Sequence, residues 1–250
     1  IPVCGTFFVF SDYMKPAIRM AALMELPVKY VWSHDSFRVG EDGPTHEPVE
    51  QEAQIRLMEE IKNHSGKNSM LVLRPADSAE TTIAWKMAME NTDSPTGLIL
   101  TRQNVEELPA KNGDRYEEAL QMVHGGYSVV DCDDPDVVLV GNGSDVLLLV
   151  KAAEQLKAEG IRSRVVSVPS VGLYMNQPEE YRNALIPRDK PVFAKTSGIS
   201  STLLPVVGTD AKISGLDHFG YSAPAKVLEE KFGYTVEHTL AEIKEFLATR

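Results

Sequence analysis

The sequence has few of the features that mark disulfide-rich, membrane or nucleic-acid-binding proteins. Only two cysteines, Cys4 and Cys132, occur in 250 residues, so we expect no disulfide framework and a reducing, cytoplasmic setting. No apolar stretch approaches the roughly 20 residues that span a bilayer. No run rich in Lys and Arg offsets the net charge of −11, which argues against a nucleic-acid partner and against binding to an anionic membrane.

Patterns typical of metal sites are also missing. The sequence has no HxxxH, HExxH or CxxC spacing, and such spacings are what bring ligands around one ion. It has no internal repeat and no low-complexity tract. The composition, 43% hydrophobic and 24% charged residues, is typical of a globular protein with one large or two ordinary domains.

Strand and helix patterns alternate along the first part of the chain. Short runs of β-branched and aromatic residues predict strands at 6–10, 27–32, 69–75 and 96–101. Helices are predicted at 14–25, 48–61 and 78–90. Pro16 suits a first helical turn, and Asp77 with Glu80 resembles a capping box. This order of elements predicts a parallel sheet.

The alternation stops near residue 110 and then begins again. Turn-forming and charged residues with weak periodicity predict a linker at 111–125. Beyond it, strands are predicted at 125–130, 136–141, 162–170 and 190–198, and helices at 146–160, 177–186, 222–233 and 235–250. We therefore predict an α/β fold of two consecutive units, 1–110 and 126–250, with mainly parallel sheets flanked by helices.

The densest group of chemically active side chains lies in SHDSFRVGEDGPTHEPVEQ, residues 33–51. This segment follows a predicted strand and precedes a predicted helix. In open α/β sheets such loops lie at the carboxyl ends of the strands, where ligands bind. His34 and His46 suit proton transfer, and Asp42 suits recognition of a hydroxyl group. A solvated loop without function is the alternative for each residue taken alone.

Other candidates stay open when only the residues are considered. Phe7, Phe10 and Tyr13 are typical of core packing. Arg102 follows a predicted strand, where its guanidinium could bind phosphate, although a surface arginine is the commoner case. The turn GNGSD at 141–145 could hold an anion on its backbone N–H groups, but it lacks the Walker lysine, and we interpret it as a tight turn.

Several strings together resemble the transketolase family. They are TFFVFSDYMKPAIRMAAL, GEDGPTHEPVEQ, LRPADSAET, LTRQN and DHFGYSAPAKVLEEKFGYT. The resemblance runs in order across nearly the whole chain. It implies the latter part of a pyrimidine-binding domain followed by the transketolase C-terminal domain. The implied activity is transfer of a two-carbon ketol unit between sugar phosphates in the pentose phosphate pathway, by a homodimer that uses thiamine diphosphate and Mg²⁺.

The resemblance also implies roles for individual residues. His34 and His46 match catalytic histidines that contact the sugar substrate. Asp42 matches an aspartate that binds a sugar hydroxyl, and Arg102 matches an arginine that binds the substrate phosphate. The aminopyrimidine ring of the cofactor is expected in an aromatic pocket formed by Phe7, Phe10 and Tyr13, with Phe10 as the stacking residue.

Two parts of the family pattern are absent. The sequence lacks the REHAM-like motif with the catalytic glutamate and the GDG-type segment that holds magnesium and diphosphate. We therefore predict no metal ligand in this chain, no activity for the chain alone, and no cofactor bound to it by itself. Glu47 stands where the family commonly has glutamine, a difference that we interpret as minor.

The sequence leaves two alternatives to this interpretation. One is another thiamine diphosphate enzyme, such as deoxyxylulose-phosphate synthase or the β subunit of a 2-oxoacid dehydrogenase. The other is a non-catalytic fragment that dimerises or binds a partner. Because the chain starts at Ile1 inside an apolar segment, we expect further sequence upstream, either on the same chain or as a separate subunit.

Overall fold

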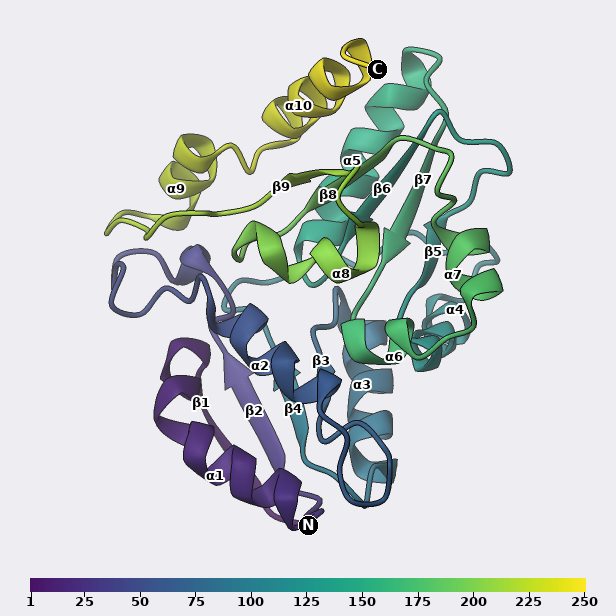
Figure 1. The fold of residues 1–250 in the computed structure, drawn as a ribbon. Coiled ribbons are helices and arrows are strands. Elements are labelled where there is room, and N and C mark those ends of the chain that lie inside the picture. Colours follow the sequence, from purple (N-terminus) through teal and green to yellow (C-terminus); the bar gives the residue numbers. More distant parts are fainter.

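The computed structural model describes residues 1–250, which form two α/β units, each built around its own sheet (Figure 1). The first sheet contains, in spatial order, β1 (Val3–Phe7), β2 (Lys29–Ser33), β4 (Thr96–Ile99) and β3 (Leu71–Leu73). The second contains β5 (Tyr127–Val130), β7 (Ser163–Ser167), β6 (Val137–Gly141), β8 (Val192–Lys195) and β9 (Lys212–Ser214). Every strand pair is parallel except β5–β7, so the predicted fold class is confirmed.

Helices cover both faces of the first sheet. α1 (Ser11–Leu23) and α2 (Gln51–Glu60) lie on one face, and α3 (Ser78–Glu90) lies on the other (Figure 1). Side chains of β2 alternate between the two: Trp32 packs in one cluster with Ile18 and Ile55, whereas Val31 packs against the cluster that contains Ile83. This period of two is what a strand buried on both faces requires.

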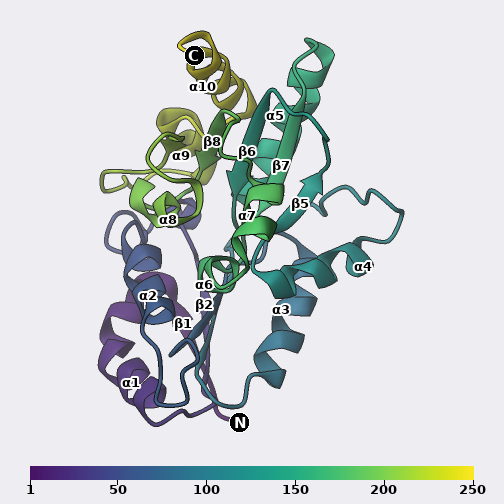
Figure 2. The same ribbon diagram turned by 45° about the vertical axis from the view of Figure 1, so that its right-hand side comes forward.

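The second sheet is covered in the same way. One face packs against α5 (Asp145–Ala158) and α10 (Val236–Ala248), and the other against α6 (Val171–Met175), α7 (Glu179–Leu185) and α8 (Leu204–Val207). The remaining helical segments of this unit are η4 (Ser200–Thr202) and α9 (Ala225–Phe232). The termini lie at opposite ends of the molecule (Figures 1 and 2).

The largest hydrophobic cluster spans both units. A cluster of 23 buried residues includes Ile83 and Leu98 of the first unit together with Leu139, Leu149 and Ile243 of the second. Residues 111–125, where we predicted a linker, contain α4 (Arg115–Ala119) and η3 (Leu120–His124). The exact limits of the two units stay a prediction.

Two local predictions near the N-terminus are wrong. The predicted strand at 6–10 is displaced: β1 ends at Phe7, and Phe8–Phe10 form the 3₁₀ turn η1. α1 then begins at Ser11, so Pro16 lies inside the helix and not in its first turn. Aromatic residues with strand propensity are in a helical turn here because Phe8 packs on Trp32, with ring centroids 5.5 Å apart, and packing outweighs local propensity.

The start of α3 confirms the predicted capping arrangement. The backbone N–H of Glu80 donates to the Asp77 side chain at 2.8 Å, and the Glu80 carboxylate accepts from the N–H of Ala76 at 2.8 Å. None of the helices combines the length and the apolar composition that crossing a bilayer would require.

Arg74, a fully buried side chain, joins the two units. Its guanidinium donates to Asp35 at 2.7 Å and to Glu52 at 2.9 Å, both in the first unit. It also donates to the side chain of Asn142 in the second unit at 3.0 Å, and Asn142 in turn donates to Glu52 at 2.6 Å. The ring of contacts satisfies charges that would otherwise be buried without partners.

A second buried arginine, Arg38, also joins the first unit to the second. Arg38, in the turn η2 (Phe37–Val39), donates to Glu229 of α9 at 2.7 Å and to the hydroxyl of Ser197 at 2.7 Å. It also lies 3.4 Å from Asp145 at the start of α5. Burial alone would raise the pKa of Asp145, but the charges of Arg38 and Arg74 lower it below the usual range.

We predict that Arg74→Met strongly destabilises the chain. The substitution keeps most of the volume but leaves Asp35 buried without its ion pair, while Glu52 keeps Arg56 as a partner. Removal of one member of a buried pair costs about 3–5 kcal/mol. Arg162→Met is the matched control, because Arg162 makes ion pairs with Asp134 and Asp136 at the surface, where solvent screens the charges and a pair contributes little to stability. Urea unfolding measures both, and equal losses would contradict the prediction.

Candidate functional site

The predicted site residues lie at one edge of the first sheet. Phe7 ends β1, His34 directly follows β2, and Arg102 comes shortly after β4. The carboxyl ends of these parallel strands meet at the same edge, and ligands of open α/β sheets bind there. The sheet therefore places three separate segments of the chain around one site.

The turn η1 orients two of the aromatic rings. In an extended strand Phe7 and Phe10 would point to opposite faces, but in a 3₁₀ turn residues three apart lie on the same side. Their rings are stacked with centroids 6.2 Å apart. Tyr13 lies at the margin of this group, with its ring 6.0 Å from Phe10 and 83% of the residue exposed.

Both histidines contact the aromatic pair. The ring of His34 stacks on Phe7 with centroids 3.6 Å apart, and the ring of His46 meets Phe10 edge-on at 5.3 Å. Nδ1 of His34 lies 2.9 Å from the hydroxyl of Ser33, and Nδ1 of His46 lies 2.9 Å from the hydroxyl of Thr45. We call Phe7, Phe10, His34 and His46 the aromatic cluster.

The backbone at His34 is in a conformation that non-glycine residues seldom adopt. Its φ is 63°, in the left-handed region. Such strain persists only where the surroundings hold it, and it occurs often at functional sites. The next residue, Asp35, is fixed by an ion pair with Arg74 at 2.7 Å, which restricts the backbone on the carboxyl side of His34.

Asp42 and Arg102 line a cavity of about 290 Å³. Its other walls come from the loop around Gly40 and, in the second unit, from Pro224 and Ala225. Asp42 and Arg102 are exposed, whereas the histidines of the aromatic cluster are half-buried. The lining also includes Glu41 and Arg38, so two anionic and two cationic residues surround the cavity.

Charges around the site act on His34. Burial lowers the pKa of His34, and the positive charge of Arg102 lowers it further, while Asp42 and Asp35 act in the opposite direction. The imidazole is therefore mainly neutral at neutral pH, with a nitrogen able to accept a proton. Arg102 and Asp42 therefore lie close enough to His34 for their charges to change its pKa.

Comparisons with known proteins agree with this geometry. Residues 1–107 match the family model of the transketolase pyrimidine-binding domain, and residues 125–235 match that of the transketolase-like C-terminal domain. The chain is 43% identical over 247 residues to the transketolase of Bacillus subtilis strain 168, an alignment that covers 97% of this chain and 35% of that protein. The chain belongs to the transketolase family.

Solved structures of transketolases share the fold. The transketolase from Leishmania mexicana superposes with a TM-score of 0.86 and 41% identity over 100% of this chain and 34% of that one. A Pichia stipitis transketolase in complex with sedoheptulose 7-phosphate superposes with a TM-score of 0.81 and 34% identity. The superposition covers 99% of this chain and 34% of that one. The chain thus spans about a third of the length of the transketolases that it matches.

The structure brings together the seven residues that the transketolase resemblance singled out. His34, His46 and Phe10 meet in the aromatic cluster, while Asp42 and Arg102 share the neighbouring cavity. The roles of these residues in binding and catalysis stay predictions. Residues 141–145 form a tight turn between β6 and α5, as predicted, with Gly143 at a φ of 56°. Its Asn142 and Asp145 are fully buried and bind the arginines of the first unit.

Glu47 is the residue that sequence analysis missed. It directly follows His46, is 3% exposed, and packs so closely on Gly220 of the second unit that a Cβ there would lie 1.5 Å from its Oε2. Burial raises the pKa of Glu47 to about 7, and a hydrogen bond from the backbone of Tyr221 acts in the opposite direction. The difference from the family's glutamine is therefore not minor, since the residue after His46 carries a buried carboxyl group whose pKa is about 7 and which packs on the second unit.

We predict that Glu47 makes the stability of the chain pH-dependent. Its pKa is near 7 in the folded chain and about 4.3 when unfolded, so the folded state binds the extra proton between these values. Stability contributed by protonated Glu47 is complete below about pH 4.3 and is lost as the pH rises through 7. Glu47→Gln should raise the melting temperature at pH 8 more than at pH 5.

The matched control is Glu50→Gln in the same segment, since Glu50 is only half-buried. Subtracting the wild-type melting curve from each variant's curve removes the titration of all other groups. A constant difference between Glu47→Gln and wild type from pH 5 to 8 would contradict the prediction.

Proposed function

We propose that the complete protein to which this chain belongs is a transketolase, which transfers a two-carbon ketol unit from a ketose phosphate to an aldose phosphate in the pentose phosphate pathway. The observation that carries the proposal is the aromatic cluster at the carboxyl edge of the first sheet, with Asp42 and Arg102 in the adjoining cavity. The names of the relatives and the sedoheptulose 7-phosphate complex of one of them support it.

Thiamine diphosphate is the proposed cofactor. Phe7, Phe10 and Tyr13 offer a partly exposed group of rings, which fits the flat aminopyrimidine because aromatic rings stack at such distances. No three His, Cys, Asp or Glu side chains gather where they could hold a metal ion. Because the sequence lacks the GDG-type segment, we assign Mg²⁺ and the diphosphate group to residues outside this chain.

Different residues of the chain then transfer protons to the sugar, bind its hydroxyl group and bind its phosphate. The cofactor supplies the electron sink for breaking the carbon–carbon bond. His34 and His46 accept and donate protons at the hydroxyl and carbonyl groups of the sugar, which suits the neutral imidazole of His34. Asp42 accepts a hydrogen bond from a sugar hydroxyl, and Arg102 binds the phosphate with its guanidinium fork.

The proposal includes the organisation of the complete enzyme. Residues 1–110 form an incomplete pyrimidine-binding domain, 111–125 the linker and 126–250 the C-terminal domain. The diphosphate-binding portion is supplied by the same polypeptide or by a separate subunit, and the complete enzyme is a cytoplasmic homodimer. The short share of each relative that the chain covers supports the need for this further portion.

We predict that the pure 250-residue chain has no ketol-transfer activity. The chain contains the proposed proton carriers and phosphate-binding residue, but it lacks the REHAM-like motif with the catalytic glutamate and the GDG-type segment for magnesium and diphosphate. The measurement is a coupled assay with xylulose 5-phosphate, ribose 5-phosphate, thiamine diphosphate and Mg²⁺. Turnover in this assay would show that the missing roles lie within the chain, whereas absence of turnover in the complete protein as well would favour the non-catalytic alternative.

We predict that Arg102→Ala in the complete protein impairs phosphorylated substrates selectively. Loss of a hydrogen bond to a charged group costs about 1.5–3 kcal/mol, so kcat/KM for xylulose 5-phosphate should fall roughly 10- to 100-fold. Hydroxypyruvate, which has no phosphate, should be much less affected. Arg19→Ala, which removes an exposed arginine of α1, is the control, and equal losses for both donors would assign Arg102 a structural role.

A further inference from the structure

The second unit contains a cavity of about 410 Å³. It lies at the amino ends of β8 and β9, whereas the first unit contacts the carboxyl edge of the same sheet. The segments that precede β8 and β9 form part of its wall, together with α7, α8 and Arg250. Its apolar surface includes Ile186, Val192 and Val206. The volume is in the range of sites that hold small organic molecules.

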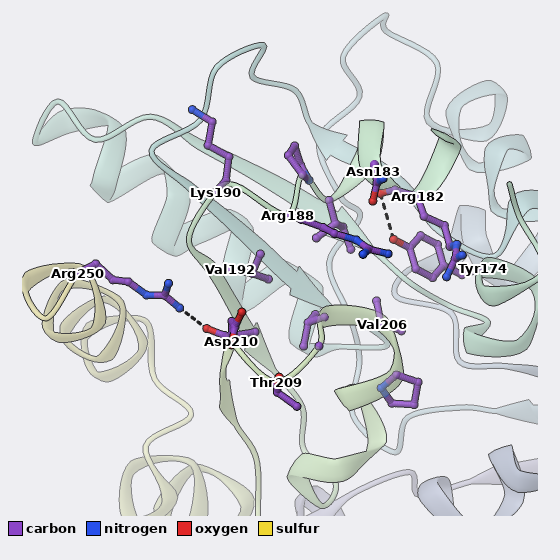
Figure 3. Close-up of a pocket in the computed structure, with 16 residues that line it drawn as sticks. Tyr174, Arg182, Asn183, Arg188, Lys190, Val192, Val206, Thr209, Asp210 and Arg250 are labelled. Carbon is purple, nitrogen blue, oxygen red and sulfur yellow. Dashed lines mark hydrogen bonds between the residues drawn. The ribbon is translucent and has the colours of Figure 1, made fainter. Parts of the chain in front are cut away.

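The polar lining of this cavity is strongly cationic. Figure 3 shows arginines approaching the cavity from two sides, Arg182 and Arg188 on the α7 side and Arg250 on the side of α10. Lys190 adds a fourth cation, and Asp210 is the acidic residue of the lining. A concentration of positive charge is unexpected in a chain with 36 acidic and 25 basic residues, and it favours an anionic ligand.

Nearby carboxylates neutralise only part of this charge. Arg188 makes an ion pair with Glu179 at 2.9 Å, and Lys190 makes one with Asp134 at 2.5 Å. Arg182 makes no ion pair. Its Nε is buried without a hydrogen-bond partner, and Nη1 contacts only the sulfur of Met175 at 3.8 Å, which is a weak acceptor.

The opposite wall also offers donors. The guanidinium of Arg250 contacts the backbone carbonyl of Asp210 and lies over the ring of Phe246 at 5.1 Å, so no carboxylate occupies it. The backbone N–H groups of Thr209, Asp210 and Ala211 make no hydrogen bond within the chain. Donors without acceptors on both sides of a cavity are what an oxyanion-bearing ligand requires.

We propose that this cavity binds a small organic phosphate, with the phosphate group on Arg182 and the organic part over Ile186, Val192 and Val206. A guanidinium binds phosphate oxygens well, and Nη2 of Arg182, which makes no hydrogen bond within the chain, would donate to the phosphate. Arg250 is close enough to the cavity to add attraction from the opposite side. The site is separate from the aromatic cluster and does not depend on the proposed function.

Isothermal titration of the 250-residue chain with phenyl phosphate, inorganic phosphate and phenol tests the proposal. Phenyl phosphate should bind more tightly than inorganic phosphate, because it adds apolar contact, and phenol should bind far more weakly than either. Arg182→Ala should weaken phenyl phosphate about tenfold or more, the scale for a lost hydrogen bond to a charged group. Arg250→Ala should weaken it less, and Asp210→Asn should strengthen it.

Two controls locate the site. Arg19→Ala removes an exposed cation of the first unit and should leave the affinity unchanged. Arg102→Ala removes the phosphate-binding residue of the proposed substrate site, so binding that persists in Arg102→Ala and is lost in Arg182→Ala supports the proposal. The reverse pattern would place the anion in the cavity lined by Asp42 and Arg102 and would overturn it. Absence of phenyl phosphate binding in the wild type, or equal affinity in a folded Arg182→Ala, overturns it too, with circular dichroism as the check on folding.

Discussion

The ion pairs of Arg74 are the interaction on which the arrangement of the two units depends. Its partners come from three places: Asp35 in the loop after β2, Glu52 on α2, and Asn142 after β6. A buried guanidinium must keep all of them, because an unpaired charge in the interior is far more costly than a lost surface pair. Sliding or rotating one unit on the other would break at least one of these contacts, so the network selects a single arrangement.

The buried ion pair of Arg74 acts on the site because its partner Asp35 directly follows His34 in the sequence. Asp35 is held by Arg74, and the preceding residue, His34, adopts its left-handed backbone conformation with its ring against Phe7. The second unit contributes no residue to the aromatic cluster. Its Asn142 nevertheless accepts a hydrogen bond from Arg74, which pairs with Asp35, the residue that follows His34. The C-terminal unit therefore has a structural role at the site, namely to keep a strained histidine in place.

Hydrophobic periodicity was sufficient for the sheets but not for the contacts between them. The strands from β2 to β8 were predicted because most buried strands are continuous apolar runs, as in the residues of β6. The shift at Phe8–Phe10 was not predictable from the sequence, since it results from packing on Trp32. Nor was the environment of Glu47, because Gly220, which buries it, is far away in the sequence. Short elements such as β9 were missed because three residues carry too little pattern.

The same distant contacts explain why the two sheets use opposite edges. In an open α/β sheet the carboxyl edge is the usual ligand site, and the first unit keeps its carboxyl edge free for the aromatic cluster. In the second unit Asn142 follows β6 and Ser197 follows β8 at that edge, and both accept hydrogen bonds from arginines of the first unit. Arg38 and Arg74 thus occupy the place where a free-standing unit would bind a ligand. The cationic cavity at the amino ends of β8 and β9 lies at the edge that this docking leaves open.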